Sequence, residues 1–269
     1  MNSLRILILL LLWLPAPIFA ESPRVISLAP HLTELAYAAG VGETLVGTVD
    51  WSDYPPEATE LPLVGDAFRY DLETILGLEP DYALAWRGGS PAAAVERIES
   101  LGIRIIWIET RSLEDVAIAL ETIGARLGQE TAGTKAAAQF RARLREVGDV
   151  DRPDTKTHKV FYQVSARPLY TLGARHVINE VFGHCGMENI FADLDTEAAV
   201  VDREAVLAAE PDLIIASLEN NNGDPLAAWR DTRLVSEGIS QLHQVEPTLL
   251  VRPTPRIIEG IEHVCSLVR

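Results

Sequence analysis

The amino-acid sequence predicts an α/β protein of two similar lobes with mainly parallel sheets, joined by a single long helix. Three observations support this fold class. Short apolar segments alternate with segments of helical periodicity, a pattern typical of parallel sheets covered by helices. A segment near the middle of the chain has the composition of a long helix. An internal repeat relates the first half of the chain to the second.

The first lobe alternates predicted strands and helices. Gly40 favours the end of its first helix, Asp71 and Ser112 are predicted N-caps, and Pro91 opens the helix between them. Asp115 stands at the capping-box position after Ser112. The predicted strands are the short apolar segments 24–29, 45–49, 82–86 and 103–108.

The second half begins with the predicted joining helix. Residues 134–147 are rich in Ala, Arg, Glu and Leu and contain no Gly or Pro, so they should form one continuous helix. A second series of elements follows, with strands at 160–164 and 213–216 and helices at 177–182, near 204 and at 256–268. The predicted division of the chain is a signal peptide at 1–20, a lobe at 21–130, a linking helix at 131–151 and a lobe at 152–269.

The repeat compares Asp71–Ala85 with Asp202–Ala216. Both copies share a leading Asp, a Glu two residues later, a second-turn Leu and a Glu-Pro-Asp turn before an apolar strand. Convergence on one cap, helix and turn pattern is the alternative, but the identical turns favour duplication. Two lobes joined by a stiff helix should rock only slightly. The cleft between them is where a ligand is expected.

The N-terminus has the layout of a secretory signal peptide. Arg5 precedes the apolar run 6–14, and residues 15–20 are helix-breaking or small. The run is short for a membrane span and no Cys follows it, so we expect a soluble chain in the periplasm without a lipid anchor. The two cysteines, Cys185 and Cys265, would then meet an oxidising compartment, which favours a disulfide over two buried thiols.

Charge and motifs exclude several functions. The chain has 39 acidic and 23 basic residues, a formal net charge of −16, which argues against nucleic acid or an anionic membrane surface as a partner. It lacks the G-x-S-x-G, phosphate-loop and H-E-x-x-H motifs. His176, His184 and Cys185 do not have the spacing of a zinc site. We therefore predict no enzyme, metal or cofactor, with an exported hydrolase as a less favoured alternative.

Candidate binding residues follow the predicted strands, where ligands of parallel α/β sheets bind. Each aromatic could instead belong to the core, but several rings at successive strand ends favour a pocket for a large flat ligand. An arginine before the last helix could donate hydrogen bonds to ligand amides or carboxylates. The candidates are His31, Trp51, Tyr54, Trp86, Arg87, Tyr170 and Arg252.

Five motifs carry a resemblance to a known family. They are Ser27–Gly40, Ser52–Pro56, Ala85–Gly89, Cys185–Phe191 and Thr254–Ile257. Together they resemble the periplasmic cobalamin (vitamin B12)-binding proteins of ABC importers, over essentially the whole mature chain. The Thr-Glu-Leu opening is shared with siderophore and haem binders, whereas the Trp-Arg-Gly-Gly segment points more narrowly to cobalamin. The resemblance implies two lobes bridged by one helix, with a corrinoid between them.

The resemblance also implies roles for particular residues. Phe68 falls near an aromatic of the family's pocket, and Cys185 and Cys265 match its disulfide. Glu73 and Glu204 occupy equal places in the repeat. The helix dipole favours each carboxylate by itself, but the resemblance implies that both dock a monomeric binding protein onto a membrane-embedded permease dimer.

The chain departs from the family at the second-lobe side of the pocket. Ala198 and Thr248 stand where the best-known member has Trp and Asp, and Trp51 stands where it has Tyr. The choice between cobalamin and another corrinoid is therefore open. A ferric-siderophore or haem carrier of the same fold is the main alternative.

Overall fold

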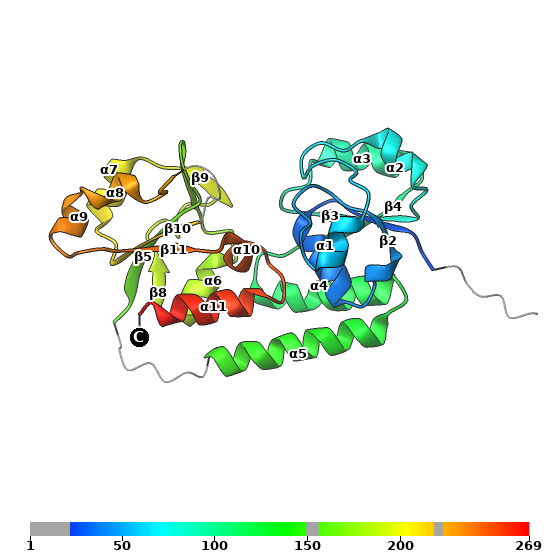
Figure 1. Cartoon of the computed structure of the whole chain (residues 1–269). Helices are drawn as coiled ribbons and strands as arrows, with labels where there is room; N and C mark the ends of the chain where they lie inside the picture. The colour runs from blue at the N-terminus through cyan, green and yellow to red at the C-terminus, as the bar shows by residue number, and fades with distance from the viewer. Residues whose placement is uncertain (1–21, 149–155, 218–222, 269) are drawn as a thin grey trace, which may run out of the picture.

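The computed structural model describes residues 22–148, 156–217 and 223–268, so the predicted signal peptide at 1–20 lies outside the described residues. Two α/β lobes stand side by side (Figure 1). The first is built on a parallel sheet whose strand order is β2-β1-β3-β4. Its strands are β1 (Val25–Ser27), β2 (Leu45–Gly47), β3 (Tyr82–Trp86) and β4 (Arg104–Ile108).

The second lobe repeats this topology. Its parallel sheet has the order β8-β5-β10-β11, so in both lobes the first strand in the chain lies between the second and the third. An additional antiparallel sheet, β6-β7-β9, is attached to this lobe. The strands are β5 (His158–Gln163), β6 (Ser165–Ala166), β7 (Leu169–Leu172), β8 (Met187–Asn189), β9 (Ala198–Val200), β10 (Leu213–Ser217) and β11 (Gln241–Val245).

The sequence repeat corresponds to a repeated set of hydrogen bonds. Asp81 donates its backbone N–H to Arg24 O (2.8 Å) and accepts from Arg24 N with its carboxylate (2.8 Å). Asp212 makes the same two bonds with Lys159, each also at 2.8 Å. In both copies the Glu before the Pro is left-handed, with φ of 46° at Glu79 and 47° at the equivalent position. The Glu-Pro-Asp turn therefore joins the third strand to the first in both lobes.

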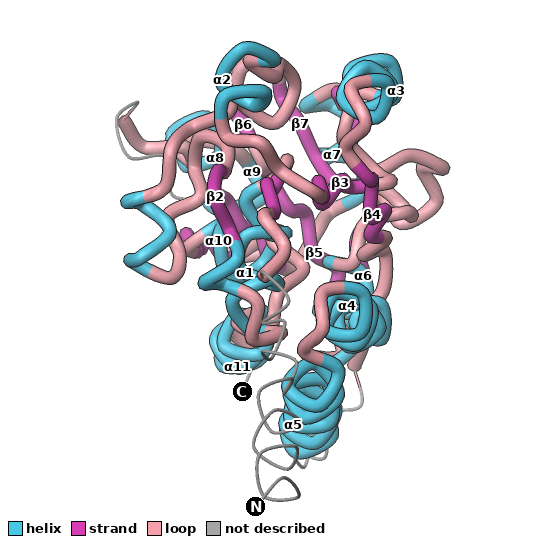
Figure 2. The backbone as a smooth tube through the Cα atoms, turned by 90° about the vertical axis from the view of Figure 1, so that its right-hand side faces the viewer, coloured by secondary structure: helices cyan, strands magenta, loops and turns pink. Residues whose placement is uncertain are grey.

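Helices cover both sheets (Figure 2). The predicted capping box is present at the start of α4, where Ser112 and Asp115 bond each other's backbone N–H. The α-helices are α1 (Pro30–Ala38), α2 (Leu72–Gly77), α3 (Ala92–Ser100), α4 (Leu113–Arg126), α5 (Glu130–Gly148), α6 (Ile178–His184), α7 (Arg203–Ala209), α8 (Ala227–Arg230), α9 (Arg233–Ser236), α10 (Pro247–Leu250) and α11 (Ile257–Ser266).

The long helix α5 runs beneath the first lobe and reaches the second (Figure 1). It packs on α4 at two glycines: a Cβ at Gly133 would lie 2.5 Å from Leu120 O, and one at Gly124 would lie 2.9 Å from Gly133 Cα. At its far end Arg143 pairs with Glu262 of α11 (3.7 Å). The helix begins before the predicted residue 134 and covers most of the predicted 131–151 linker. The domain boundaries themselves stay a prediction.

The two lobes also share one hydrophobic core. Leu120 of α4, Phe140 of α5, Ile178 of α6 and Ile261 of α11 belong to a single cluster of buried side chains. The disulfide Cys185–Cys265 is present, with an S–S distance of 2.07 Å, and joins the end of α6 to α11. Continuous packing of this kind restricts motion between the lobes. Within the described residues, no helix combines the length and apolarity needed to cross a membrane.

Candidate ligand-binding site

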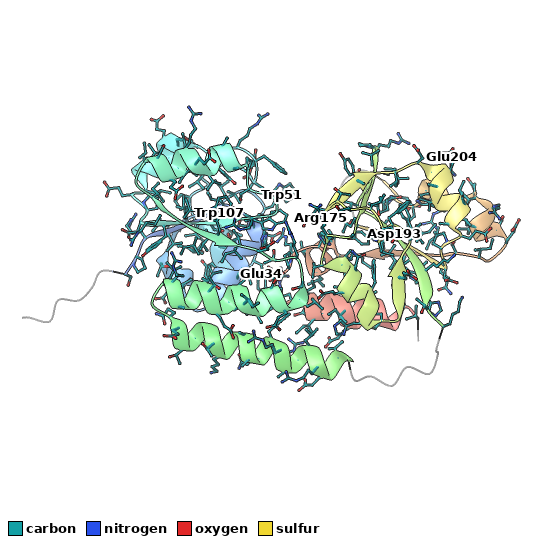
Figure 3. The ribbon with its side chains drawn as sticks, turned by 180° about the vertical axis from the view of Figure 1, so that it is seen from behind. Glu34, Trp51, Trp107, Arg175, Asp193 and Glu204 are labelled. Carbon is teal, nitrogen blue, oxygen red and sulfur yellow. A yellow bond between two sulfur atoms is a disulfide. The ribbon has the colours of Figure 1, made fainter. Side chains whose placement is uncertain are left out.

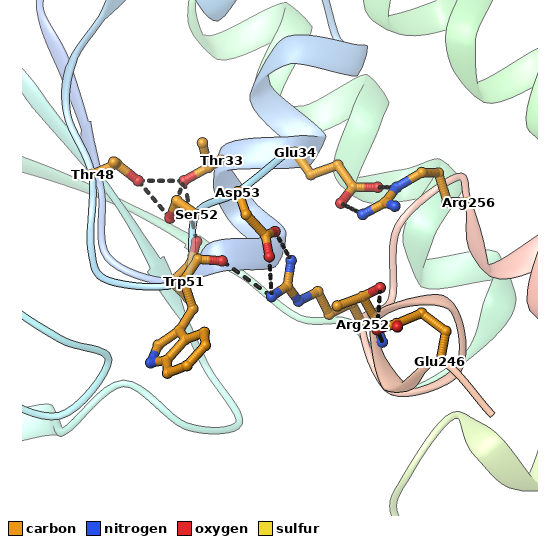
Figure 4. Close-up of polar contacts among 11 residues, drawn as sticks. Thr33, Glu34, Thr48, Trp51, Ser52, Asp53, Glu246, Arg252 and Arg256 are labelled. Atoms are coloured by element: carbon orange, nitrogen blue, oxygen red, sulfur yellow. Dashed lines mark hydrogen bonds and ion pairs between the residues drawn. The ribbon is translucent and has the colours of Figure 1, made fainter. Parts of the chain in front are cut away.

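The loop after β2 carries Trp51 and is held by three buried hydroxyl groups. The hydroxyls of Thr33 and Thr48 lie 2.7 Å apart, and Ser52 Oγ lies 3.2 Å from the first and 2.7 Å from the second (Figure 4). Thr33 lies in α1, so this triangle ties the loop to the helix beneath it. Buried polar groups that satisfy one another fix local geometry, and this triangle therefore fixes where the loop presents its aromatic ring.

The backbone of Trp51 adopts a strained conformation. Its φ is 68°, in the left-handed region that costs a residue with a Cβ about 1 to 2 kcal/mol. Its side chain is nonetheless 78% exposed, so no burial of the ring offsets that cost within the chain. Figure 3 places Trp51 on the side of the first lobe that faces Arg175 of the second. Strain that presents an apolar ring to solvent is typical of a ligand-binding position.

Arg252 reaches this loop from the second lobe. Its Nη1 donates to Asp53 Oδ1 (2.5 Å) and its Nη2 donates to Trp51 O (3.1 Å), as Figure 4 shows. The Arg252 side chain is 15% exposed and that of Asp53 is 52% exposed, so the cation of this pair is largely buried while its carboxylate is open to water. Arg252 was a predicted candidate, whereas Asp53 was given no role from the sequence.

A second arginine of the same segment forms a more buried contact between the lobes. Arg256 Nε and Nη2 donate to the two carboxylate oxygens of Glu34, each at 2.8 Å (Figure 4). Its guanidinium carbon also lies 3.8 Å from the ring centroid of Tyr54. The Glu34 side chain is 3% exposed, so its charge depends on this bidentate partner. The pair thus holds Arg256 against the ring of Tyr54, in the loop that carries Trp51. Neither Glu34 nor Arg256 was given a role from the sequence.

Trp86 lies at the end of β3 on a support made by its own motif. Its ring packs edge-on against His31, with ring centroids 5.0 Å apart. A Cβ at Gly89 would lie 2.1 Å from the Trp86 ring, and one at Gly88 would lie 2.9 Å from it. The two glycines of the Trp-Arg-Gly-Gly segment therefore let the indole lie flat on the backbone. The result is a half-buried ring of fixed orientation.

His31 is buried below this ring and is 5% exposed. Burial, and to a lesser degree the positive charge of Arg252, lower the pKa of His31 to about 3. The imidazole is therefore neutral at physiological pH. Its Nε2 is buried and forms no hydrogen bond within the described residues. His31 supports Trp86, and a direct contact between His31 and a ligand stays a prediction.

The remaining candidates are separate from this centre. Phe68 is 72% exposed on a turn that Asp66 closes by accepting from the N–H groups of Phe68 and Arg69. Tyr170 is partly exposed in β7 of the second lobe. The Arg87 guanidinium lies 5.1 Å from the Trp107 ring centroid, on the outer strand β4. Within the described residues, no hydrogen bond, ion pair or ring contact links these three side chains to Arg252.

Further charges line the two lobes near Glu197. Arg111, which follows β4, pairs with Glu109 (3.1 Å), and Arg175 of the second lobe pairs with Asp195 (2.8 Å). Burial raises the pKa of Glu197, while Arg111 and Arg175 act on it in the opposite direction. The facing surfaces thus combine exposed rings with arginines that already have carboxylate partners.

This arrangement has relatives among known proteins. The profile of the family described as "Periplasmic binding protein" matches residues 25–232. The chain belongs to this family. Its members are substrate-binding proteins rather than enzymes, which confirms the prediction of a binding protein. Within the described residues, no cluster of three or more His, Cys, Asp or Glu side chains is arranged to hold a metal ion.

Curated members of the family resemble the chain over nearly their whole length. The vitamin B12-binding protein of Vibrio cholerae is 37% identical over 247 residues, which cover 91% of this chain and 89% of that protein. The vitamin B12-binding protein of Pectobacterium atrosepticum is 33% identical and covers 92% and 89%. These similarities confirm the resemblance found in the five sequence motifs.

Solved structures give the same result for the fold. The periplasmic vitamin B12-binding protein BtuF of Vibrio cholerae superposes with a TM-score of 0.82 at 36% identity, covering 91% of this chain and 96% of that one. A periplasmic haem-binding protein of Pseudomonas aeruginosa has a TM-score of 0.80 at 23% identity, covering 91% and 92%. The second similarity shows the shared two-lobe fold alone.

The predicted docking carboxylates lie on one side of the molecule. Glu73 is exposed in the first turn of α2, and Glu204 is exposed in the first turn of α7. Both helices lie on the side opposite α5 (Figure 1), and Figure 3 labels Glu204 there. The expectation that the leading Asp of each repeat copy caps its helix is wrong for the second copy. The side chain of Asp71 accepts two backbone N–H bonds at the start of α2, but Asp202 makes no side-chain cap on α7.

Proposed function

We propose that this chain captures cobalamin or a related corrinoid outside the inner membrane and delivers it to an ABC importer. One observation carries the proposal. Relatives named as vitamin B12-binding proteins are 33 to 37% identical over about nine-tenths of both chains. Structures of haem-binding proteins with the same fold are only 20 to 23% identical. Signal-peptide export, a periplasmic location and a monomeric state are parts of the proposal.

The geometry supports a large, neutral and amphipathic ligand. Trp51 and Tyr54 on one lobe and Tyr170 on the other offer exposed ring surface. Arg252 already has a carboxylate partner, as does Arg256. A corrinoid presents a broad face and a rim of amides, so it would gain apolar contact from the rings without bringing several uncompensated charges.

A haem or ferric-siderophore carrier is the second candidate, because proteins with haem-binding names share the fold. The chemistry of the described site favours it less. His31 is buried below Trp86. The ring of Tyr54 stacks on Arg256. A ligand with several negative charges would also have to compete with Asp53 and Glu34 for the two arginines.

Ligand binding is tested by mixing the purified protein with cyanocobalamin, haem or a ferric siderophore. The visible spectrum is then recorded after gel filtration, and calorimetry gives affinity. We expect corrinoid binding at one site per chain. Replacing Trp51 or Trp86 by Ala should weaken it by about 1 to 4 kcal/mol. Leu101→Ala, an exposed apolar change beyond α3, is the control. Binding of haem but of no corrinoid would overturn the proposal in favour of the second candidate.

We further propose that Glu73 and Glu204 dock the protein onto the permease. Their equivalent places in two related lobes suit two equivalent basic pockets of a two-fold symmetric membrane dimer. The variants Glu73→Ala and Glu204→Ala should fold and bind ligand normally but bind the transporter more weakly. The double variant should bind the transporter more weakly than either single variant. The affinity of the wild-type protein for the transporter should fall as the salt concentration is raised.

The docking test needs a control on another surface. Glu146→Ala removes an exposed carboxylate from α5, on the opposite side of the molecule. This variant should bind the transporter as wild type does. If the double variant at positions 73 and 204 also bound as wild type, docking would be ruled out. The two carboxylates would then serve only to complement the helix dipoles.

A further inference from the structure

A carboxylate accompanies the arginine that faces the candidate site. Asp53 holds Arg252 through the 2.5 Å bond to Nη1, and its second oxygen lies 3.5 Å from Nη2. The Asp53 side chain is 52% exposed, whereas that of Arg252 is 15% exposed. The loop therefore turns a negative group towards solvent beside the positive one. A ligand that approaches Arg252 therefore meets a guanidinium group that is already paired with a carboxylate.

The other arginine of this segment does not add an unpaired positive charge. The guanidinium of Arg256 is bound by both oxygens of Glu34. Asp50 adds another exposed carboxylate to the same loop. An anionic ligand group at this point would have to displace Asp53 or lie beside it, at the cost of repulsion between like charges.

We propose that Asp53 is a specificity-determining residue that selects ligands carrying a primary amide over ligands carrying a carboxylate at this position. This inference rests on the proposed corrinoid binding and refines it. A primary amide matches the ion pair because its carbonyl oxygen can accept from Arg252 while its NH₂ group donates to Asp53. A carboxylate has hydrogen-bond acceptors but no donor. It can accept from Arg252, but its negative charge is repelled by that of Asp53.

The test compares the affinities of wild type, Asp53→Asn and Asp50→Asn for two kinds of corrinoid. The first is cyanocobalamin, and the second comprises its monocarboxylic acids, in each of which one peripheral amide is hydrolysed. Asn keeps an oxygen acceptor for Arg252 but removes the charge. For at least one acid isomer, wild type should bind the amide more tightly by about tenfold, and Asp53→Asn should remove most of that preference.

The matched control is Asp50→Asn, which removes one charge from the same loop and leaves the pair of Arg252 with Asp53 in place. It should keep the wild-type preference for the amide. Equal loss of preference in both variants, or an unchanged preference in Asp53→Asn for every isomer, would overturn this inference while corrinoid binding stood. A wild type that bound no corrinoid would overturn the proposed function and this inference with it.

Discussion

The two lobes order their parallel strands in the same way, yet within the described residues only one of them carries a disulfide and a second, antiparallel sheet. The shared part is the framework of strands, including the Glu-Pro-Asp turn and the reciprocal bonds of Asp81 and Asp212. The differences lie in the segments attached to that framework. A duplicated framework therefore kept the bonds that align its strands, while its loops diverged.

The divergence divides the candidate site between the lobes. The first lobe contributes the strained and exposed Trp51, the stacked Tyr54 and the supported Trp86. The second lobe contributes Arg252 and Arg256, whose side chains hold the first lobe's loop in place. The loop that carries Trp51 and Tyr54 is thus held by residues of both lobes, and the predictions below compare the two lobes from the largest expected effect to the smallest.

Removal of the disulfide should have the largest effect on stability, and it should act on the second lobe. The Cys185–Cys265 link closes a loop of 80 residues. Replacing both cysteines by Ala should lower the free energy of unfolding by about 4 kcal/mol. Urea denaturation measures the loss, and hydrogen exchange locates it. Faster exchange in the β1–β4 sheet than in the second lobe would contradict the prediction.

Breaking the buried pair between the lobes should come next. Glu34→Ala leaves Arg256 without its bidentate partner and should cost about 3 kcal/mol of unfolding free energy. The control is Glu262→Ala, which breaks the exposed pair with Arg143 and should cost less than about 1 kcal/mol. Equal effects in the two variants would mean that the buried pair does not join the lobes more strongly than the exposed one.

Each lobe also has a histidine whose lowered pKa should make stability depend on pH. Burial lowers the pKa of His31 to about 3 and that of His176 to about 4, from the ordinary value of 6.5. Below pH 6.5 the unfolded chain binds protons that the folded chain does not. The free energy of unfolding should therefore fall between pH 7 and pH 5, by about 2 kcal/mol for each histidine.

Thermal denaturation across this pH range checks the prediction. His31→Gln and His176→Gln should each flatten the dependence. A wild-type Tm that stayed constant from pH 7 to pH 5 would show that neither imidazole resists protonation.

The smallest expected effect concerns the leading Asp of each repeat copy. The Asp71 carboxylate accepts from Glu73 N (3.0 Å) and Thr74 N (3.2 Å), whereas Asp202 makes no such bond. Asp71→Ala should lower the Tm by about 2 °C, and Asp202→Ala should lower it less. Equal shifts would mean that Asp202 caps α7 in solution, which would make the two lobes more alike than the structure has them.

Local patterns in the sequence predicted most of the framework. The capping box of α4, the composition of α5 and the strand at 82–86 depend on near neighbours, so periodicity and propensity could identify them. The edge strand β11 and the short β8 were not predicted. Strand β11 contains too few apolar residues to show the alternation of a half-buried strand. Strand β8 has three residues, which are too few to show a period.

The sequence by itself also predicted the aromatic candidates for the site, because aromatic residues followed successive predicted strands. Only the tertiary structure decided how they are held. The ion pairs Arg252–Asp53 and Arg256–Glu34 join positions about 200 residues apart in the chain. No local pattern relates such positions, because their contact depends on how both lobes pack around the shared core. The same packing decided that His31 is buried and neutral, whereas Trp51 is exposed.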